Sequence, residues 1–274
     1  MTIDAHQHFW HYSPQTHEWI NEEMQVIRRD FLPNDLAPVL RANGIDGCVA
    51  VQADQTDSES DFLLNLAAEH DFIKGVVGWT DLKSPELDQK LEAYKQNPLL
   101  KGFRHIVQGE PDGFMTDPAF ITGISRLNGF DLSYDILVFS RQLYEVCQLI
   151  KQLPEMRLVM DHFGKPDIKA GEFNLWKKHM TELSAYPHLH VKLSGLVTEA
   201  DWKHWKLSDF QPYIETILEL FGPKRILFGS DWPVCLVAAS YEQVLEIVNW
   251  YIEKLSMQEQ AAVKGLNAVR FYGL

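Results

Sequence analysis

The chain has 274 residues, of which 46% are hydrophobic and 23% are charged, a composition typical of a globular protein. Its formal net charge of −13 at pH 7 argues against binding to nucleic acid or to an anionic membrane. Its three cysteines, Cys48, Cys147 and Cys235, are odd in number and far apart, so they predict neither a disulfide framework nor a cysteine zinc site. The N-terminus has no basic segment followed by an apolar one, and no apolar run approaches the roughly 20 residues that span a bilayer, so we expect a cytoplasmic protein without a signal peptide or membrane segment.

The first predicted element is a buried strand over residues 3–9 that carries two histidines. Because side chains alternate along a strand, His6 and His8 should point to one face and Gln7 to the other. Two imidazoles about 7 Å apart along a strand can bind one metal ion or flank one small substrate. Each could instead simply hydrogen-bond to neighbouring backbone, which is the commoner role of an isolated His-x-His. The aromatic-rich segment 10–31 that follows lacks periodicity and is either a functional loop or a packing loop.

From residue 34 onward, helical and strand patterns alternate. The predicted strands are the runs 3–9, 46–52, 73–79, 100–106, 131–137, 157–163, 189–194 and 225–231. The predicted helices cover 34–42, 58–69, 84–97, 117–129, 140–153, 172–185 and 210–220, followed by one that starts at Ser240 and a short last one after Ser256. Helix starts are indicated by Asn34 and Asp35, by Ser84–Pro85, Asp117–Pro118 and Ser140, and by capping boxes of Ser240 with Gln243 and of Ser256 with Glu259.

This order of elements predicts an α/β fold. The strands are far enough apart for right-handed βαβ units, and several are continuously apolar, as expected when both faces of a strand are covered. No segment resembles a linker, and no internal repeat is visible. We therefore predict a (β/α)8 TIM barrel that forms a single domain over residues 1–274, with its chemistry at the C-terminal ends of the strands.

Ionisable side chains recur at these predicted strand ends. They are His6 and His8, Arg104 and His105, Asp135, Asp161 and His162, Lys192, and Asp231 with its neighbours Ser230 and Trp232. Any one of them could belong to a structural ion pair. Buried charges are costly, however, and their recurrence on six strands is hard to explain by packing alone. The pattern predicts a polar active site at one mouth of the barrel.

Six stretches of the chain carry a family resemblance. They are residues 6–10 (HQHFW), 76–79 (VVGW), 102–105 (GFRH), 161–166 (DHFGKP), 192–195 (KLSG) and 228–233 (FGSDWP). In their order and placement the chain resembles the amidohydrolase superfamily, in its metal-dependent "family 2" branch, and within it the sugar lactonases of the L-fuconolactonase and L-rhamnono-lactonase type. The resemblance covers essentially the whole chain. It implies a barrel, a hydrolase that acts on the carboxylic ester bond of a small sugar lactone, and a place in carbohydrate metabolism.

The resemblance also bears on a metal cofactor. Many members of the superfamily hold two metal ions through a carboxylated lysine at the end of strand four, where this chain has Arg104 and His105. A binuclear site is therefore not expected. The resemblance leaves two alternatives: one divalent ion, zinc or manganese, bound by His6, His8 and Asp231, with or without His162, or no required metal at all.

Lactone hydrolysis needs a base for the attacking water and positive groups near the carbonyl oxygen. We expect the catalytic residues to be Asp231, His162 and Arg104, with Asp231 as the general base. If no metal ion is bound, His162 would donate to the developing oxyanion together with His6 and His8. Arg104 would hold ring oxygens or the nascent carboxylate. We expect the substrate to be bound by His105, Lys192, Trp10 and Trp232, the last two as an apolar floor under the sugar ring. The oligomeric state, including a homo-oligomer, is left open.

Two other functions compete with this hypothesis. The first is a non-oxidative decarboxylase, because such relatives use a similar His-x-His and strand-eight aspartate with one metal ion. The stretches 161–166 and 192–195 favour the lactonase. The second is a barrel that binds sugar acids without catalysis, but binding alone does not require a base opposite two imidazoles.

Overall fold

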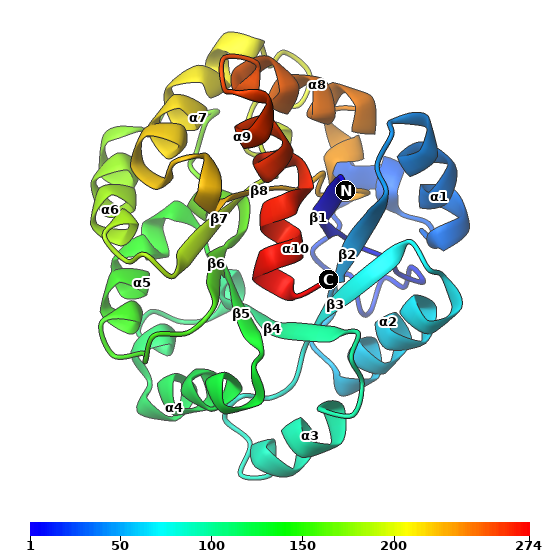
Figure 1. The fold of residues 1–274 in the computed structure, drawn as a ribbon, viewed down its shortest axis with the longest axis vertical. Helices are drawn as coiled ribbons and strands as arrows, with labels where there is room; N and C mark the ends of the chain where they lie inside the picture. The colour runs from blue at the N-terminus through cyan, green and yellow to red at the C-terminus, as the bar shows by residue number, and fades with distance from the viewer.

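The computed structural model describes residues 1–274 and shows one sheet of eight parallel strands in the order β1 to β8, with helices around it (Figure 1). The strands are β1 (Ile3–Gln7), β2 (Gly47–Val51), β3 (Ile73–Gly78), β4 (Leu100–Ile106), β5 (Ser133–Leu137), β6 (Leu158–Met160), β7 (Leu189–Leu193) and β8 (Ile226–Phe228). The helices are α1 (Pro33–Ala42), α2 (Asp57–Glu69), α3 (Leu87–Tyr94), α4 (Pro118–Leu127), α5 (Leu143–Ile150), α6 (Asn174–Ser184), α7 (Leu207–Phe221), α8 (Tyr241–Ile252), α9 (Met257–Ala261) and α10 (Asn267–Tyr272). The predicted (β/α)8 barrel and all eight predicted strands are confirmed.

The sheet closes into a barrel where β1 meets β8. Gln7 and Trp232 form a parallel bridge. The amide of His8 donates to the carbonyl of Trp232 at 2.7 Å, and the amide of Asp231 donates to the carbonyl of His6 at 2.8 Å. The seam of the barrel is therefore formed by residues that the sequence singled out as candidates for the site.

A β-bulge in β1 sets the direction of its side chains. Asp4 lies opposite Cys48 and Gln7 lies opposite Ala50, so that three steps along β1 face two along β2. Gln7 turns outward, where its amide donates to Cys48 Sγ at 3.3 Å. His6 and His8 both face the barrel interior, and their ring centroids are 4.9 Å apart. The prediction that the two histidines share a face is confirmed.

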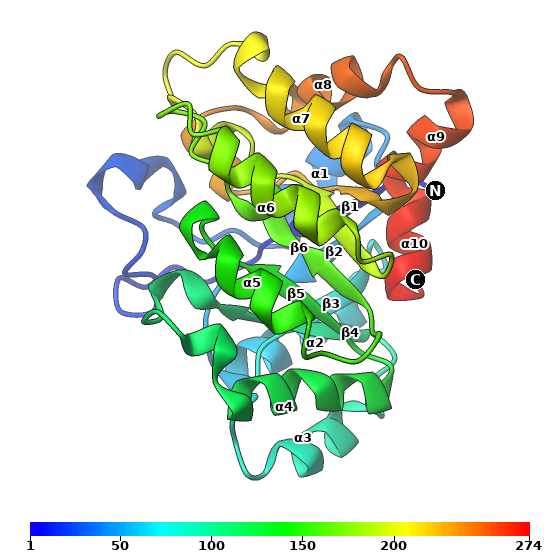
Figure 2. The same ribbon diagram turned by 90° about the vertical axis from the view of Figure 1, so that its left-hand side faces the viewer.

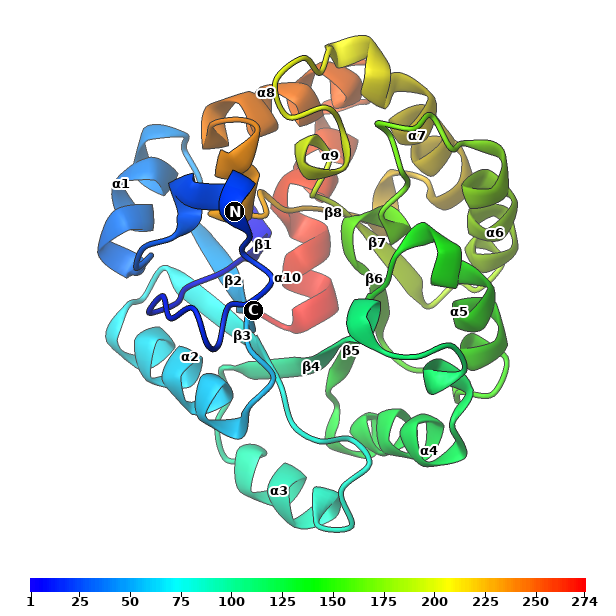
Figure 3. The ribbon, with the colours of Figure 1, turned by 180° about the vertical axis from the view of Figure 1, so that it is seen from behind.

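The barrel interior is apolar at one end. One small core cluster there consists of Ile3, Ala5, Val49, Val51, Val77, Val159, Leu227, Ala268, Phe271 and Tyr272. The last three belong to α10, which lies across this mouth in Figure 1. Figures 2 and 3 show that the long segment after β1 lies at the opposite mouth. The helix α10 thus closes the N-terminal end of the strands and leaves the other end for polar side chains.

The helix starts agree with the sequence prediction in part. Asp117 caps α4 by accepting from the amide of Ala119, and the two capping boxes at Ser240 and Ser256 are present. Ser84 instead forms a turn before α3, since its hydroxyl accepts from the amide of Glu86 at 3.2 Å. Ser140 begins a short 3-10 turn ahead of α5 and does not cap that helix. None of the helices combines the length and apolar character that crossing a bilayer would require.

Candidate active site

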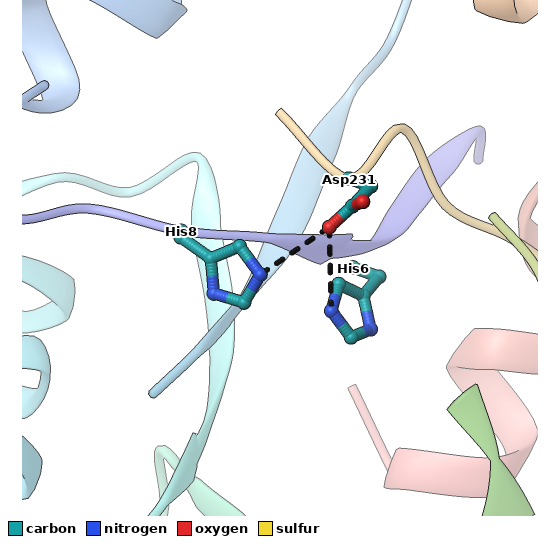
Figure 4. Close-up of side chains that lie close together, drawn as sticks. All are labelled: His6, His8 and Asp231. Carbon is teal, nitrogen blue, oxygen red and sulfur yellow. Dashed lines mark ion pairs between the residues drawn. The ribbon is translucent and has the colours of Figure 1, made fainter. Parts of the chain in front are cut away.

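Three imidazoles surround one carboxylate oxygen at the C-terminal mouth of the barrel. His8 Nε2 lies 3.4 Å from Asp231 Oδ1, and His6 Nε2 and His162 Nε2 each lie 3.9 Å from the same oxygen. In Figure 4 the two histidines of the first strand point toward the carboxylate, which comes from the segment after β8. All four residues are at most 5% exposed. The structure thus brings together residues from the two ends and the middle of the sequence.

The backbone after β8 is shaped to deliver Asp231. Gly229 passes so close to β1 that a Cβ there would lie 2.6 Å from Cβ of His6, which only glycine avoids. Asp231 has a φ of 59°, in the left-handed region that few residues other than glycine adopt. Such a conformation persists only when its surroundings hold it, and the bond from its amide to the His6 carbonyl is one such restraint.

Asp4 holds the same turn from behind. Its Oδ1 accepts from the amide of Ser230 at 2.9 Å, and its Oδ2 accepts from the hydroxyls of Ser230 at 2.6 Å and of Tyr241 at 3.1 Å. Burial raises the pKa of Asp4 to about 6, although the hydrogen bonds from Ser230 act in the opposite direction. The sequence analysis did not identify Asp4 as a residue of the site. Its position inside an apolar strand could have indicated such a role, because a buried carboxylate is costly unless it has partners.

The charge state of the cluster follows from burial and from its neighbours. Burial opposes ionisation of Asp231, but the facing imidazole of His162, together with those of His8 and His6, lowers the pKa of Asp231 below that of an ordinary carboxyl group. Burial lowers the pKa of His162 to about 4, and burial is also the main reason that the pKa of His6 lies well below its usual value. At neutral pH the cluster therefore contains an ionised Asp231 facing neutral His6 and His162.

A second group of charges lies deeper in the barrel and contacts His6. Asp161 Oδ1 is 3.3 Å from His6 Nδ1 and 2.9 Å from Lys192 Nζ. Lys192 Nζ is also 3.2 Å from His6 Nδ1 and 2.6 Å from the carboxylate of Asp135. Lys192 has no exposed surface, and two carboxylates surround its ammonium group. The structure thus places Lys192 beneath the cluster, where it supports His6. The predicted contact of Lys192 with the substrate stays a prediction, and the enclosed position of the side chain does not favour it.

Arg104 joins the two groups. Its Nη1 is 3.2 Å from His6 Nε2 and 3.0 Å from Asp161 Oδ2. Its Nε and Nη2 donate to Gln52 Oε1 at 3.0 and 2.7 Å, and Nη2 also donates to the Gln52 carbonyl. A planar guanidinium with several donors suits such a set of acceptors. The sequence analysis did not identify Gln52, the residue that follows β2, as part of the site. A polar amide at the end of an apolar strand could have indicated this role.

The residues at the mouth fit one metal ion. His8 Nδ1 lies 2.8 Å from the Val51 carbonyl and must donate to it, so a neutral His8 presents the lone pair of Nε2 to Asp231. Two acceptors then face each other at 3.4 Å, and a second proton on His8 or a metal ion is needed between them. Tetrahedral zinc with ligands at about 2.0–2.1 Å separates its donor atoms by roughly 3.3 Å. His6, His8 and Asp231 offer donor atoms that all lie within 4.8 Å of one another.

His105 lies outside this cluster. Since side chains alternate along β4, Arg104 faces the interior and His105 faces the helices. Its Nδ1 accepts from Trp79 Nε1 at 3.3 Å, its Nε2 lies 2.8 Å from Glu110, and its ring stacks on Phe114. Both ring nitrogens are thus occupied. The predicted substrate contact of His105 stays a prediction that the structure does not support.

Trp10 and Trp232 are likewise enclosed by packing. Trp10 is 1% exposed, and its indole donates to the Arg29 carbonyl at 2.9 Å. Trp232 is 3% exposed and packs edge-on against Phe9 and Phe31. Both rings hold the segment after β1 onto the barrel, which makes them supports of the mouth. Their predicted contact with a sugar stays untested.

A groove with a volume of about 1000 Å³ lies among the loops at the C-terminal end of the barrel. It is lined by loops that follow β5, β6, β7 and β8, and the lining residues include Arg141, Lys165, Glu199, Trp202 and His204. Its lining does not include the four cluster residues, which are themselves almost enclosed. The groove offers space for a polar small molecule at the same end of the barrel as the cluster.

Comparison with known proteins adds three findings. A family model described as amidohydrolase matches residues 3–274. The chain is 41% identical to a protein of Burkholderia multivorans named L-fucono-1,5-lactonase, over 100% of this chain and 96% of the relative, and 35% identical to one of the same name from Burkholderia ambifaria, over 98% and 94%. A crystal structure of an amidohydrolase from Burkholderia multivorans with bound zinc superposes with a TM-score of 0.97 at 41% identity, covering 100% and 99% of the two chains.

Proposed function

This chain belongs to the amidohydrolase family, and from that premise we propose that it hydrolyses L-fucono-1,5-lactone, or a close stereoisomer, to the free sugar acid. The nearly full-length similarity to two proteins named for that lactone supports the substrate class. The observation that carries the reaction is the single carboxylate of Asp231 among three imidazoles.

In this proposal Asp231 orients and deprotonates the attacking water. A carboxylate whose pKa is lowered stays ionised, so it is available to accept a hydrogen bond and then a proton. Water adds to the lactone carbonyl carbon, and the proton that Asp231 takes up is returned to the ring oxygen when the ring C–O bond breaks. The products are a free hydroxyl group and a carboxylic acid, which releases its remaining proton to solvent and becomes a carboxylate. Positioned proton transfer contributes roughly 10²- to 10⁴-fold to such reactions.

The oxygen of the carbonyl group becomes negative in the tetrahedral intermediate. We assign His162 as the donor to it, because His162 stands opposite Asp231. Arg104, whose N–H groups are all directed to Gln52, His6 and Asp161, contributes a fixed positive charge beside His6. A zinc or manganese ion bound by His6, His8 and Asp231 would polarise the carbonyl or acidify the water. Arg104 competes with such an ion, since its Nη1 lies 3.2 Å from the His6 Nε2 that would bind it.

The decarboxylase alternative has no support beyond the fold. A 2,6-dihydroxybenzoate decarboxylase has the same fold at only 13% identity, which shows a shared barrel and nothing about activity. No feature of the cluster favours carbon dioxide release over ester hydrolysis. L-Rhamnonolactone remains a second candidate substrate within the proposed class.

A pH-indicator assay tests the proposal. The purified protein would be offered L-fucono-1,5-lactone, L-rhamnonolactone and other aldono-lactones, both after chelation and with added zinc or manganese, alongside aromatic acids as decarboxylase substrates. We expect the highest kcat/KM for L-fucono-1,5-lactone. The proposal fails if no lactone opens faster than it does with the Asp231→Asn variant, or if an aromatic acid is decarboxylated instead.

A further inference from the structure

We propose that Tyr272, in the C-terminal helix, is a positioning residue of the active site and acts through Asp135 and Lys192 on His6. The inference rests on the proposed function, because its main readout is lactone turnover. Nothing in the sequence pattern singled out Tyr272. It lies in α10, the helix that crosses the N-terminal mouth of the barrel in Figure 1 and lies on the side away from the long segment after β1 in Figure 2.

Tyr272 brings a hydroxyl group into the barrel interior. Its ring packs in the apolar layer that closes the N-terminal mouth, and the residue is 2% exposed. Its hydroxyl donates to Asp135 Oδ2 at 2.7 Å. Asp135 has no exposed surface, and its Oδ1 accepts from the hydroxyl of Ser133 at 3.2 Å. A purely apolar plug such as phenylalanine would fill the same space, so the hydroxyl has a role other than packing.

Three further contacts lead from Asp135 to the mouth. The Asp135 Oδ2 that Tyr272 contacts also accepts from Lys192 Nζ at 2.6 Å. That ammonium group is 2.9 Å from Asp161 Oδ1 and 3.2 Å from His6 Nδ1. A continuous chain of polar contacts therefore runs from α10 to the histidine that faces Asp231. All of it is enclosed in the barrel, where electrostatic interactions are stronger than in water.

The position of the Lys192 ammonium depends on how its two carboxylate partners share it. Tyr272 takes up part of the acceptor capacity of Asp135 Oδ2. Without the hydroxyl, Asp135 has Lys192 as its only partner at that oxygen, and Lys192 is drawn toward Asp135 and away from Asp161 and His6. The flexible four-carbon stem of lysine permits such a shift. His6 then loses the contacts that orient its ring toward Asp231.

The test is Tyr272→Phe, which keeps the ring and removes the hydroxyl. A displacement of 1 Å in a catalytic group can cost about a hundredfold in rate, and for this smaller shift we expect kcat to fall about tenfold with KM within twofold. Asp135→Asn should lower kcat at least as much. If Tyr272 acts through Asp135, the double variant should have the kcat of Asp135→Asn alone, because coupled residues are not additive.

The matched control is Phe271→Leu, the neighbouring change in α10. Phe271 packs in the same apolar layer, against His190 and edge-on against the ring of Tyr272, but its side chain has no polar group that could join the chain of hydrogen bonds and ion pairs. We expect it to lower the melting temperature without lowering kcat. The inference is wrong if Tyr272→Phe keeps wild-type kcat, or if the effects of the two network variants simply add. If either Tyr272→Phe or Asp135→Asn fails to fold, the kcat of the other variant is the measurement that tests the inference.

A substrate-free measurement separates this inference from the proposed function. The NMR signals of the His6 imidazole should shift in Tyr272→Phe and in Asp135→Asn and stay unchanged in Phe271→Leu. A wild-type protein that opens no lactone while His6 responds in this way would refute the proposed function and leave the network intact. Unchanged His6 signals in both network variants would overturn the inference.

Discussion

The backbone amide of Asp231 donates a hydrogen bond to the carbonyl oxygen of His6 at 2.8 Å, across the seam where β8 meets β1. One of the bonds that close the barrel thus also places the carboxylate against the first histidine. Gly229 allows the approach, and Asp4 holds the turn from the other side. The stability of the closed barrel and the geometry of the candidate site therefore depend on the same few contacts.

Replacing Asp231 should remove activity and keep the fold. Asp231→Asn has the same shape but cannot accept the proton of water, so we expect kcat to fall at least about a hundredfold. Circular dichroism and lactone assays on the same preparation would check this. Asp71→Asn, at an exposed position, is the control. Near-full activity of Asp231→Asn would exclude this residue as the base.

Removing His8 should weaken metal binding. Losing even an outer partner of a metal ligand costs roughly 10- to 100-fold in affinity, so we expect loss of a ligand in His8→Ala to cost more than about a hundredfold. Zinc titration by calorimetry, with metal content measured after dialysis, would report the change for a wild type that binds one ion per chain. His204→Ala, whose side chain is 79% exposed, is the control. Equal zinc affinity in wild type and His8→Ala would rule out the assigned ligands.

Glu59 should make stability depend on pH. Burial raises the pKa of Glu59 to about 7 from an ordinary value of 4.5, while its Oε1 accepts from the amide of Ala53 at 2.8 Å. A raised carboxyl pKa gives stability that is fully present below pH 4.5 and is lost as the pH rises through about 7. Glu59→Gln keeps the acceptor and cannot ionise.

We therefore expect Glu59→Gln to melt several degrees above wild type at pH 8 and close to wild type at pH 5. Thermal unfolding followed at both pH values would measure this difference. Glu69→Gln, at the exposed end of the same helix, should show no such difference between the two pH values. A melting-temperature difference that is the same at pH 5 and pH 8 would contradict the assignment.

We expect His105 to contribute to stability and not to substrate binding. Because Trp79 and Glu110 occupy both of its ring nitrogens, we expect His105→Asn to lower the melting temperature and to leave KM for the lactone within about twofold of wild type. Steady-state kinetics and thermal unfolding would measure both quantities. A severalfold rise in KM with unchanged stability would restore the substrate contact that the sequence suggested.

Local patterns in the sequence were sufficient for the architecture. Apolar runs separated by helix-starting signals predicted eight strands and the barrel, because strand and helix periodicity depend on near neighbours in the chain. The same alternation placed His6 and His8 on one face. The same alternation could also have shown that Arg104 and His105, which are adjacent in one strand, point to opposite faces. We instead predicted a substrate contact for His105 because it lies near the end of its strand. Helix starts were less certain, as at Ser84 and Ser140, where a turn uses the capping side chain.

The sequence by itself therefore determined the barrel, the end at which its polar residues gather and the four residues that meet there, His6, His8, His162 and Asp231. Only the tertiary structure decided how those residues are held. The bulge in β1 arises from pairing with β2, and Asp4, Gln52 and Tyr272 act through partners distant in the chain. Such contacts have no local signature, because they depend on side chains that meet only when the sheet closes.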